Sequence, residues 1–211
     1  MIPSLYLDQV SFYYEDDYPL FENLSLQFDP VQATAIVGPS GCGKTTLLHL
    51  LAGILNPHKG TVALGDKVFQ NMSLVRKEAL IFDSFSFIFS SAFLIPELTV
   101  QQNIELGLIH SLNQEQKAMI STFNLADKLS CYPEMLSSGQ QQRVSVLRAL
   151  LRPSYYVLAD EPTAHLDTQR SHDLIPQLIK ALKLQKRGFI CVTHDRSLLT
   201  FFDNVIDLGA L

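Results

Sequence analysis

Apolar residues gather in short runs toward both ends of the chain, and their spacing predicts strands there. Aromatic and aliphatic residues at positions 5–14 and 20–28 predict two strands, separated by an acidic turn at 15–17 and by Pro19. Further strands are predicted at residues 32–37, 61–69 (with a turn at Gly65-Asp66), 85–89, 155–159, 189–192 and 205–208.

Helical spacing of apolar residues predicts the remaining elements. Helices are expected at residues 44–53, 100–109, 114–123, 138–151, 168–184 and 196–202, and Pro176 is expected to bend the fifth of these. Residues 99–151 contain no convincing strand. Alternating strands and helices at both ends predict an α/β fold with a parallel sheet covered by helices, and the strand-free middle predicts an inserted helical lobe.

Composition agrees with one folded domain and disfavours several other classes of protein. The 211 residues are 47% hydrophobic and 18% charged, and the net charge is −5. A weakly acidic chain is a poor candidate for binding nucleic acid by charge, so no nucleic-acid partner is expected. The cysteines, Cys42, Cys131 and Cys191, are odd in number and form no CxxC motif, which disfavours a disulfide scaffold and a structural zinc site.

The sequence also lacks the patterns of targeting and membrane insertion. The N-terminal residues have no basic or apolar segment typical of a signal peptide. The longest apolar stretches, at 47–55 and 85–96, are interrupted by polar residues and are shorter than the roughly 20 residues that span a bilayer. We expect a soluble protein of a reducing compartment, with any membrane role exerted through a partner.

A phosphate-binding loop follows the predicted strand at 32–37. The residues Gly38-Pro39-Ser40-Gly41-Cys42-Gly43-Lys44-Thr45 match G-x-x-x-x-G-K-[ST] and open the predicted helix at 44–53, which also contains Thr46. Glycines let backbone N–H groups point at phosphate oxygens, and the helix N-terminus adds its positive dipole end. Lys44 supplies a cation to the β- and γ-phosphates, and the Thr45 hydroxyl can bind Mg²⁺.

Two adjacent acids end the predicted strand at 155–159. Because ligands bind at the carboxyl ends of strands in an open parallel sheet, Asp160 is expected near Lys44, where it can hold Mg²⁺ directly or through water. Glu161 follows and can accept a proton from a water in line with the γ-phosphate. The sequence therefore predicts nucleoside triphosphate hydrolysis.

Several further motifs occur in a characteristic order. They are Val10-Ser11-Phe12-Tyr13-Tyr14, Leu136-Ser137-Ser138-Gly139-Gln140, Ala164-His165-Leu166-Asp167 and Thr193-His194-Asp195. The second closely resembles the LSGGQ signature of ATP-binding-cassette (ABC) ATPases. The third resembles the D-loop of that family, and the fourth resembles its switch-histidine region. The resemblance covers essentially the whole chain.

This resemblance implies a fold, a division of the chain and a set of partners. It implies a P-loop NTPase (RecA-like) core, an N-terminal antiparallel β subdomain, and a helical signature subdomain at 86–140 inserted between 1–85 and 141–211. It also implies that two subunits pair head to tail around two ATP molecules with Mg²⁺, as a homodimer or with a second ABC subunit. Transmembrane permease subunits would hold the chain on the cytoplasmic face of the membrane and dock at residues 91–102.

The resemblance also implies roles for individual residues. Tyr14 would stack on adenine, and Lys44, Glu161 and His194 would act at the γ-phosphate. Ser137 and Gly139, together with Gln140 and Asp167, would complete the site of the opposite subunit. These roles are carried over from the positions that match the motifs of the family.

One position departs from the family pattern. The family has a glutamine at the end of the strand that leads into the helical subdomain, where it contacts Mg²⁺ and the attacking water. Ser90 occupies that place, and no glutamine occurs from Met72 to Val100. Serine is shorter by roughly 2–3 Å, which predicts a metal contact through water and slower or differently coupled hydrolysis. Ser138 replaces the first glycine of the signature, a smaller change.

The main interpretation is an ATPase subunit that powers a separate permease. The alternative is a regulatory ABC ATPase that drives a membrane protein mechanically without moving a solute. Soluble ABC proteins of translation or DNA repair usually carry two cassettes or a long coiled coil, which 211 residues do not accommodate. A binding module without hydrolysis is a further alternative because of Ser90, but the retained Glu161 and His194 disfavour it.

Overall fold

The computed structural model describes residues 2–15, 18–108 and 110–210 of the chain. A five-stranded parallel sheet forms its centre, with strand order β6-β7-β8-β3-β9. Its strands are β3 (Ala33–Val37), β6 (Phe85–Ile88), β7 (Tyr156–Asp160), β8 (Gly188–Val192) and β9 (Asn204–Asp207). The predicted α/β fold with a mainly parallel sheet is therefore confirmed.

A second, antiparallel sheet is formed by the N-terminal part of the chain, in the order β2-β1-β4-β5. Its strands are β1 (Leu5–Glu15), β2 (Tyr18–Phe28), β4 (Lys59–Leu64) and β5 (Lys67–Val68). The predicted strand at 61–69 is in fact the β4–β5 hairpin, because the chain reverses at Gly65-Asp66 and Phe69–Asn71 forms a 3₁₀ helix. Positions 16 and 17 of the predicted acidic turn lie outside the described residues.

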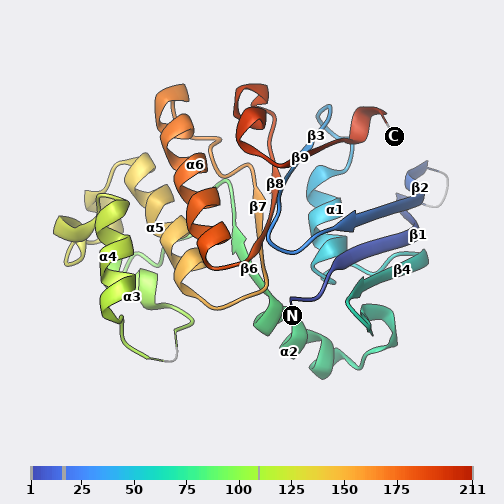
Figure 1. The fold of residues 1–211 in the computed structure, drawn as a ribbon, viewed down its shortest axis with the longest axis horizontal. Coiled ribbons are helices and arrows are strands. Elements are labelled where there is room, and N and C mark those ends of the chain that lie inside the picture. The colour runs from blue at the N-terminus through green and yellow to red at the C-terminus, as the bar shows by residue number, and fades with distance from the viewer. Residues whose placement is uncertain (1, 16–17, 109, 211) are drawn as a thin grey trace.

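The described residues form six α-helices, which cover the sheets or lie beside them (Figure 1). They are α1 (Lys44–Leu51), α2 (Leu74–Ser84), α3 (Val100–Glu105), α4 (Gln114–Thr122), α5 (Ser138–Leu151) and α6 (Thr168–Leu184). Sequence patterning missed α2, which has only a short apolar face. The predicted helix at 100–109 was too long, since α3 ends at Glu105, and position 109 lies outside the described residues. The segment predicted as a helix at 196–202 is a 3₁₀ helix, Arg196–Phe201, and α6 continues through Pro176.

The parallel sheet is buried on both faces. Along β7, Tyr156 and Leu158 enter the core that contains α1 and the antiparallel sheet, whereas Val157 enters the core that contains α5 and α6. Figure 1 shows the same division, with α5 and α6 on one side of the sheet and α1 with β1 and β2 on the other. Because both faces are covered, only the strand ends are open to ligands.

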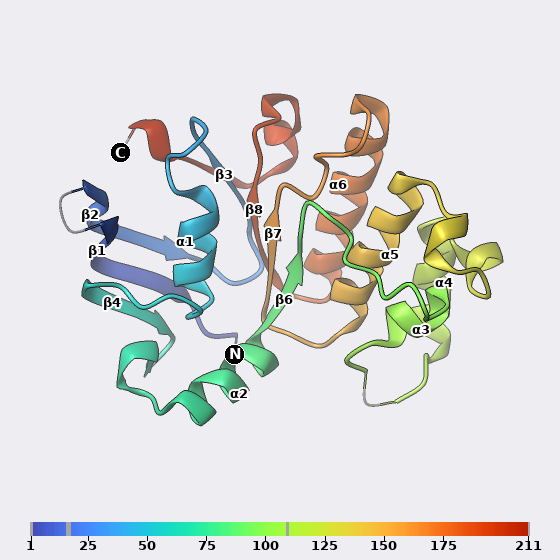
Figure 2. The ribbon, with the colours of Figure 1, turned by 180° about the vertical axis from the view of Figure 1, so that it is seen from behind.

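The helices α3 and α4 and the N-terminal part of α5 form a lobe beside the sheet, as seen from behind in Figure 2. No strand occurs between positions 99 and 151 among the described residues, as predicted. β6 continues to Ile88, so the parallel sheet crosses the boundary predicted at residue 85.

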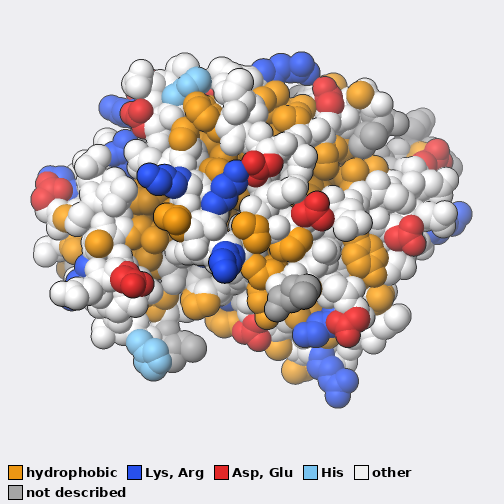
Figure 3. Space-filling model, in the orientation of Figure 1, with side chains coloured by type: hydrophobic (Ala, Val, Ile, Leu, Met, Phe, Trp, Pro, Cys, Tyr) orange, Lys and Arg blue, Asp and Glu red, His pale blue; other side chains and the backbone are white. Residues whose placement is uncertain are grey.

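In the described part of the chain, no helix is long and apolar enough to span a membrane. Basic and acidic side chains are interspersed on the face shown in Figure 3.

Candidate active site

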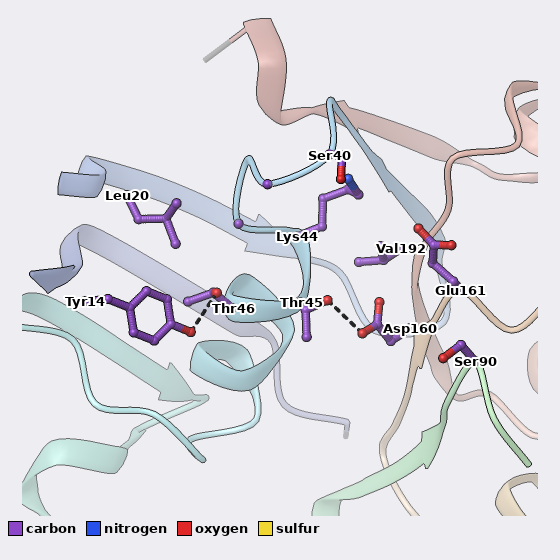
Figure 4. Close-up of a pocket in the computed structure, with 12 residues that line it drawn as sticks. Tyr14, Leu20, Ser40, Lys44, Thr45, Thr46, Ser90, Asp160, Glu161 and Val192 are labelled. Atoms are coloured by element: carbon purple, nitrogen blue, oxygen red, sulfur yellow. Dashed lines mark hydrogen bonds between the residues drawn. The ribbon is translucent and has the colours of Figure 1, made fainter. Parts of the chain in front are cut away.

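A pocket of about 440 Å³ opens where the parallel strands β6, β7 and β8 end. Ser90 follows β6, Asp160 ends β7 and Val192 ends β8, so three strand ends bring side chains to one place (Figure 4). The pocket is lined by Tyr14, Leu20, Ser40, Gly41, Gly43, Lys44, Thr45, Thr46, Ser90, Asp160, Glu161 and Val192. The size is in the range of pockets that bind small molecules and cofactors.

The loop between β3 and α1 has the backbone conformation that a phosphate cradle needs. Gly43 has φ 96°, and a Cβ there would lie 2.7 Å from the Phe21 ring, so the position requires glycine for conformation and for space. The Lys44 ammonium donates to the carbonyl oxygens of Gly38 (3.0 Å) and Pro39 (2.8 Å). The first turn of α1 has no side-chain cap, which leaves its N–H groups available to an anion.

The residues predicted to hold Mg²⁺ meet in the pocket next to Lys44. The Thr45 hydroxyl donates to Asp160 Oδ2 over 2.8 Å, as drawn in Figure 4, and Ser90 lies in the same pocket. Hydroxyl and carboxylate oxygens are the hard ligands that Mg²⁺ prefers, and the ion usually retains several waters. The donor set therefore fits a magnesium ion beside the phosphate loop.

Glu161 and His194 are in direct contact. His194 Nδ1 lies 2.7 Å from Glu161 Oε2, and the backbone N–H of Glu161 donates to the carbonyl oxygen of Val192. Glu161 has φ 48°, a left-handed conformation that is uncommon for a residue other than glycine and occurs preferentially at functional sites. Beneath them, burial together with the charges of Asp160 and Glu161 raises the pKa of the Cys191 thiol, which is neutral.

Tyr14 stands at the outer end of the pocket. The residue is 68% exposed, and its hydroxyl lies 3.0 Å from the Thr46 hydroxyl on α1. Leu20 from β2 lines the same pocket, so this end presents an aromatic ring and an apolar side chain. Sequence reasoning identified Tyr14 and Thr46 but missed Leu20 and Val192, which belong to no motif and appeared only as strand residues.

The signature residues lie outside this pocket, at the N-termini of α5 and α6. Ser137 caps α5, since its hydroxyl accepts from the Gln140 N–H while the Gln140 side chain accepts from the Ser137 N–H. Asp167 caps α6 in a similar way. Gly139 is buried, and a Cβ there would lie 3.3 Å from Leu166. Their predicted role toward the ATP of a second subunit remains a prediction.

Three residues of the predicted loop do not line the pocket. Gly38 and Pro39 contribute the carbonyls that bind Lys44, and Cys42 is half-buried with a free thiol. A Cβ at Gly38 would lie 2.7 Å from Cys42 Sγ, so this glycine keeps the base of the loop closed. These residues therefore support the phosphate loop without facing the pocket.

Comparison with known proteins identifies the family. Residues 21–164 match the family model for the ABC transporter. The chain belongs to this ABC family. It is 37% identical to the ABC transporter ATP-binding protein YtrE of Bacillus subtilis, over 86% of this chain and 81% of that protein. It is 32% identical to the lipoprotein-releasing system ATP-binding protein LolD of Buchnera aphidicola, over 86% and 82% of the two chains.

Solved structures of ABC cassettes agree with this assignment. The dimeric post-hydrolysis state of the ATP-binding cassette MJ0796, bound to ADP and Pi, superposes with a TM-score of 0.82 at 28% identity and covers 97% of this chain and 95% of that chain. The ABC ATPase described here therefore has the fold predicted from its motifs. It is an ATP-binding subunit that hydrolyses ATP.

Proposed function

We propose that this ABC ATPase works as a head-to-tail dimer that requires Mg²⁺ and powers a separate membrane-spanning permease. The observation that carries the proposal is the division of the motifs between two places. The phosphate loop, Asp160 and Glu161 share one pocket, whereas Ser137 and Asp167 lie at the ends of other helices and outside it. A second subunit that presents its signature to this pocket completes the site.

Within one subunit, the residues have distinct tasks in hydrolysis. Lys44 and the N–H groups of the loop bind the phosphates of ATP, and Tyr14 stacks on its base. Glu161 accepts the proton of the attacking water, and His194, which contacts Glu161, binds the γ-phosphate. Thr45 and Asp160 would hold Mg²⁺, which would supply positive charge against the charge that develops on the phosphate oxygens. Hydrolysis thus depends on positioning and electrostatics.

The opposite subunit contributes the N-terminus of α5. Ser137 is exposed and caps a helix of 14 residues, so its hydroxyl and the N-terminal end of the dipole can both face an anion. Gly139 and Gln140 belong to the same first turn, and Asp167 at the start of α6 borders it, since Gly139 packs close to Leu166 and Arg170. The γ-phosphate bound by one subunit is the anion that fits this place.

A permease is the partner that fits the exposed apolar side chains near β6. Phe82, Phe89, Phe93 and Ile95 are 61%, 36%, 66% and 41% exposed, and the Phe89 and Phe93 rings contact each other with centroids 5.5 Å apart. Exposed apolar patches of this kind mark interaction sites. Bound there to permease subunits, the chain would lie at the cytoplasmic face of the membrane. The second candidate, a regulatory ATPase that acts on a membrane protein without transporting a solute, would use the same surface.

Membrane fractionation tests the permease assignment. In cells that produce the chain with its natural partners, the wild-type protein is expected to sediment with membranes. The change Phe93→Asp puts a charge on the patch and is expected to move the protein to the soluble fraction. Leu184→Asp, at an exposed apolar residue (77%) at the end of α6, is the matched control and should leave the distribution unchanged. Equal behaviour of the two variants would contradict the assignment.

A further inference from the structure

The segment that carries Ser90 into the pocket is attached to the signature helix by hydrogen bonds. Ser90 follows Phe89 at the end of β6, and the carbonyl oxygen of Phe89 accepts a hydrogen bond from Gln142 Nε2 of α5 over 2.9 Å. The Gln142 side chain is buried, with 4% of the residue exposed. Because the Gln142 amide is buried, loss of this contact would leave a buried donor without a hydrogen-bond partner.

Arg148, further along the same helix, holds the other end of this segment. Its guanidinium donates from Nη1 to the carbonyl oxygen of Phe93 and from Nη2 to that of Ala92, both over 2.9 Å. Arg148 is half-buried, and this burial lowers the pKa of its guanidinium below the usual value. Removing a guanidinium from water costs free energy that these hydrogen bonds offset.

The conformation of the segment is one that its sequence would not adopt unaided. Phe93 has φ 45°, a left-handed conformation that is a genuine outlier for a bulky residue and is therefore strained. It persists where surrounding contacts enforce it, and Arg148 provides such a contact at the Phe93 carbonyl. The strain at Phe93, the buried amide of Gln142 and the half-buried guanidinium of Arg148 thus all act on the short segment that contains Ser90.

The short side chain of Ser90 makes this attachment consequential. Serine reaches roughly 2–3 Å less far than glutamine and has a single side-chain torsion to its hydroxyl. A longer side chain could compensate for a displaced backbone, but Ser90 cannot. The position of its hydroxyl relative to Asp160 is therefore set by the backbone, and the backbone is held by Gln142 and Arg148.

We propose that Gln142 and Arg148 are positioning residues for hydrolysis. Their hydrogen bonds attach the segment that carries Ser90 to α5, the helix that begins at the signature residues. The magnesium-binding side of the pocket therefore moves together with α5. The N-terminus of α5 carries Ser137, so contact with the opposite subunit's nucleotide would adjust the Ser90 hydroxyl through one rigid element. This inference rests on the proposed place of Ser90 at the magnesium site. It assigns no contact with ATP to Gln142 or Arg148.

The test is the change Gln142→Met, made in the wild-type chain and in a Ser90→Gln background. Methionine preserves length and burial but removes the donor to Phe89. In the wild-type background we expect kcat to fall about 3- to 10-fold. The Mg²⁺ concentration at half-maximal rate should rise, and the KM for ATP should stay within about twofold. In the Ser90→Gln background the same change should have little effect, because the longer side chain tolerates a displaced backbone.

Gln141→Met is the matched control. Gln141 is the preceding residue of α5, and its amide donates to the carbonyl of Pro133 over 2.9 Å instead of to the segment around Ser90. Its replacement should leave the Mg²⁺ dependence unchanged. Should Gln142→Met not fold, judged by circular dichroism, Arg148→Lys provides the second variant, since it preserves the charge but loses the two-pronged contact.

Three results would overturn the proposal. Two of them concern the role of Gln142, and the third concerns the place of Ser90. Equal loss of kcat in both backgrounds, or an unchanged Mg²⁺ dependence, would show that Gln142 does not act through Ser90. If Ser90→Ala and Ser90→Gln each leave the rate and the Mg²⁺ dependence unchanged, the place of Ser90 at the metal site is wrong as well. ATP hydrolysis by the wild-type chain is measured alongside every variant. An inactive wild-type chain would contradict the proposed function itself and is thereby distinguished from failure of the positioning proposal.

Discussion

Replacing Glu161 by glutamine tests its proposed role as proton acceptor separately from every other feature of the pocket. Glutamine has the same number of heavy atoms, can occupy the same left-handed backbone conformation at φ 48°, and can still bond His194 across the 2.7 Å contact. The carboxylate is the only group lost. Lys44 and the phosphate loop are untouched, so ATP binding should survive.

The expected loss follows from the role of a general base. Such groups contribute typically a factor on the order of 10²–10⁴ to the rate, or about 3–5 kcal/mol of transition-state stabilisation. The kcat of Glu161→Gln should fall by this factor while the Kd for ATP changes little. Because ATP is bound but not cleaved, the ATP-bound dimer should accumulate and be visible by size-exclusion chromatography.

The assay is phosphate release in the steady state, with ATP affinity measured separately by equilibrium dialysis. Glu78→Gln is the matched control, since it makes the same chemical change at an exposed residue of α2 that does not line the pocket. It should retain wild-type hydrolysis. Wild-type turnover by Glu161→Gln would refute the assignment of Glu161 as the base, and a parallel loss of ATP binding would show that the change acts on the fold of the pocket.

Two further predictions concern tyrosines. Tyr14→Ala should weaken ATP binding about 5- to 150-fold, because stacking on a base contributes roughly 1–3 kcal/mol. Tyr14→Phe retains the ring and should bind ATP nearly as well as the wild-type chain. Binding is measured by titration with a fluorescent ATP analogue, and equal affinities of the two variants would contradict the role of Tyr14. Tyr156→Phe removes the hydroxyl that donates to the Pro3 and Phe28 carbonyls (3.0 and 3.1 Å), so urea denaturation at pH 7 should show a loss of about 1–2 kcal/mol in the free energy of unfolding. Burial raises the pKa of Tyr156 above its usual value near 10, so the contribution of its hydroxyl to the free energy of unfolding is fully present below about pH 10 and is lost as the pH rises further. Above that pH, the free energy of unfolding should therefore decline more steeply for the wild-type chain than for Tyr156→Phe. Parallel curves of unfolding free energy against pH would contradict this.

Local motifs made much of the fold and site predictable. The phosphate loop specifies its own strand, turn and helix through glycines and a lysine at fixed spacing, so the positions of Lys44 and Thr45 were correct before any tertiary information. The carboxyl-end rule for parallel sheets then correctly placed Asp160 beside Thr45, because β7 is a short apolar strand that ends in acids.

Features that depend on long-range contacts were not predictable from the sequence. The bond from Gln142 to Phe89 joins residues 53 positions apart, and it belongs to no spacing rule for a single helix. α2 was missed because its apolar face is short, and its buried Lys77, which donates to Asn56 over 2.8 Å, looks like an ordinary surface lysine in the sequence. Such contacts are decided by packing between elements, on which local periodicity carries no information.

The proposed sharing of the hydrolytic site between two subunits has a direct kinetic consequence. The measurement is initial ATPase rate per subunit against concentration of the purified chain, with the fraction of dimer determined by sedimentation under the same conditions. The rate per subunit should rise with the dimer fraction, and Ser137→Arg, which blocks the signature but leaves the phosphate loop of its own subunit intact, should abolish the rise. A rate per subunit that stays constant down to demonstrably monomeric protein would contradict the shared site.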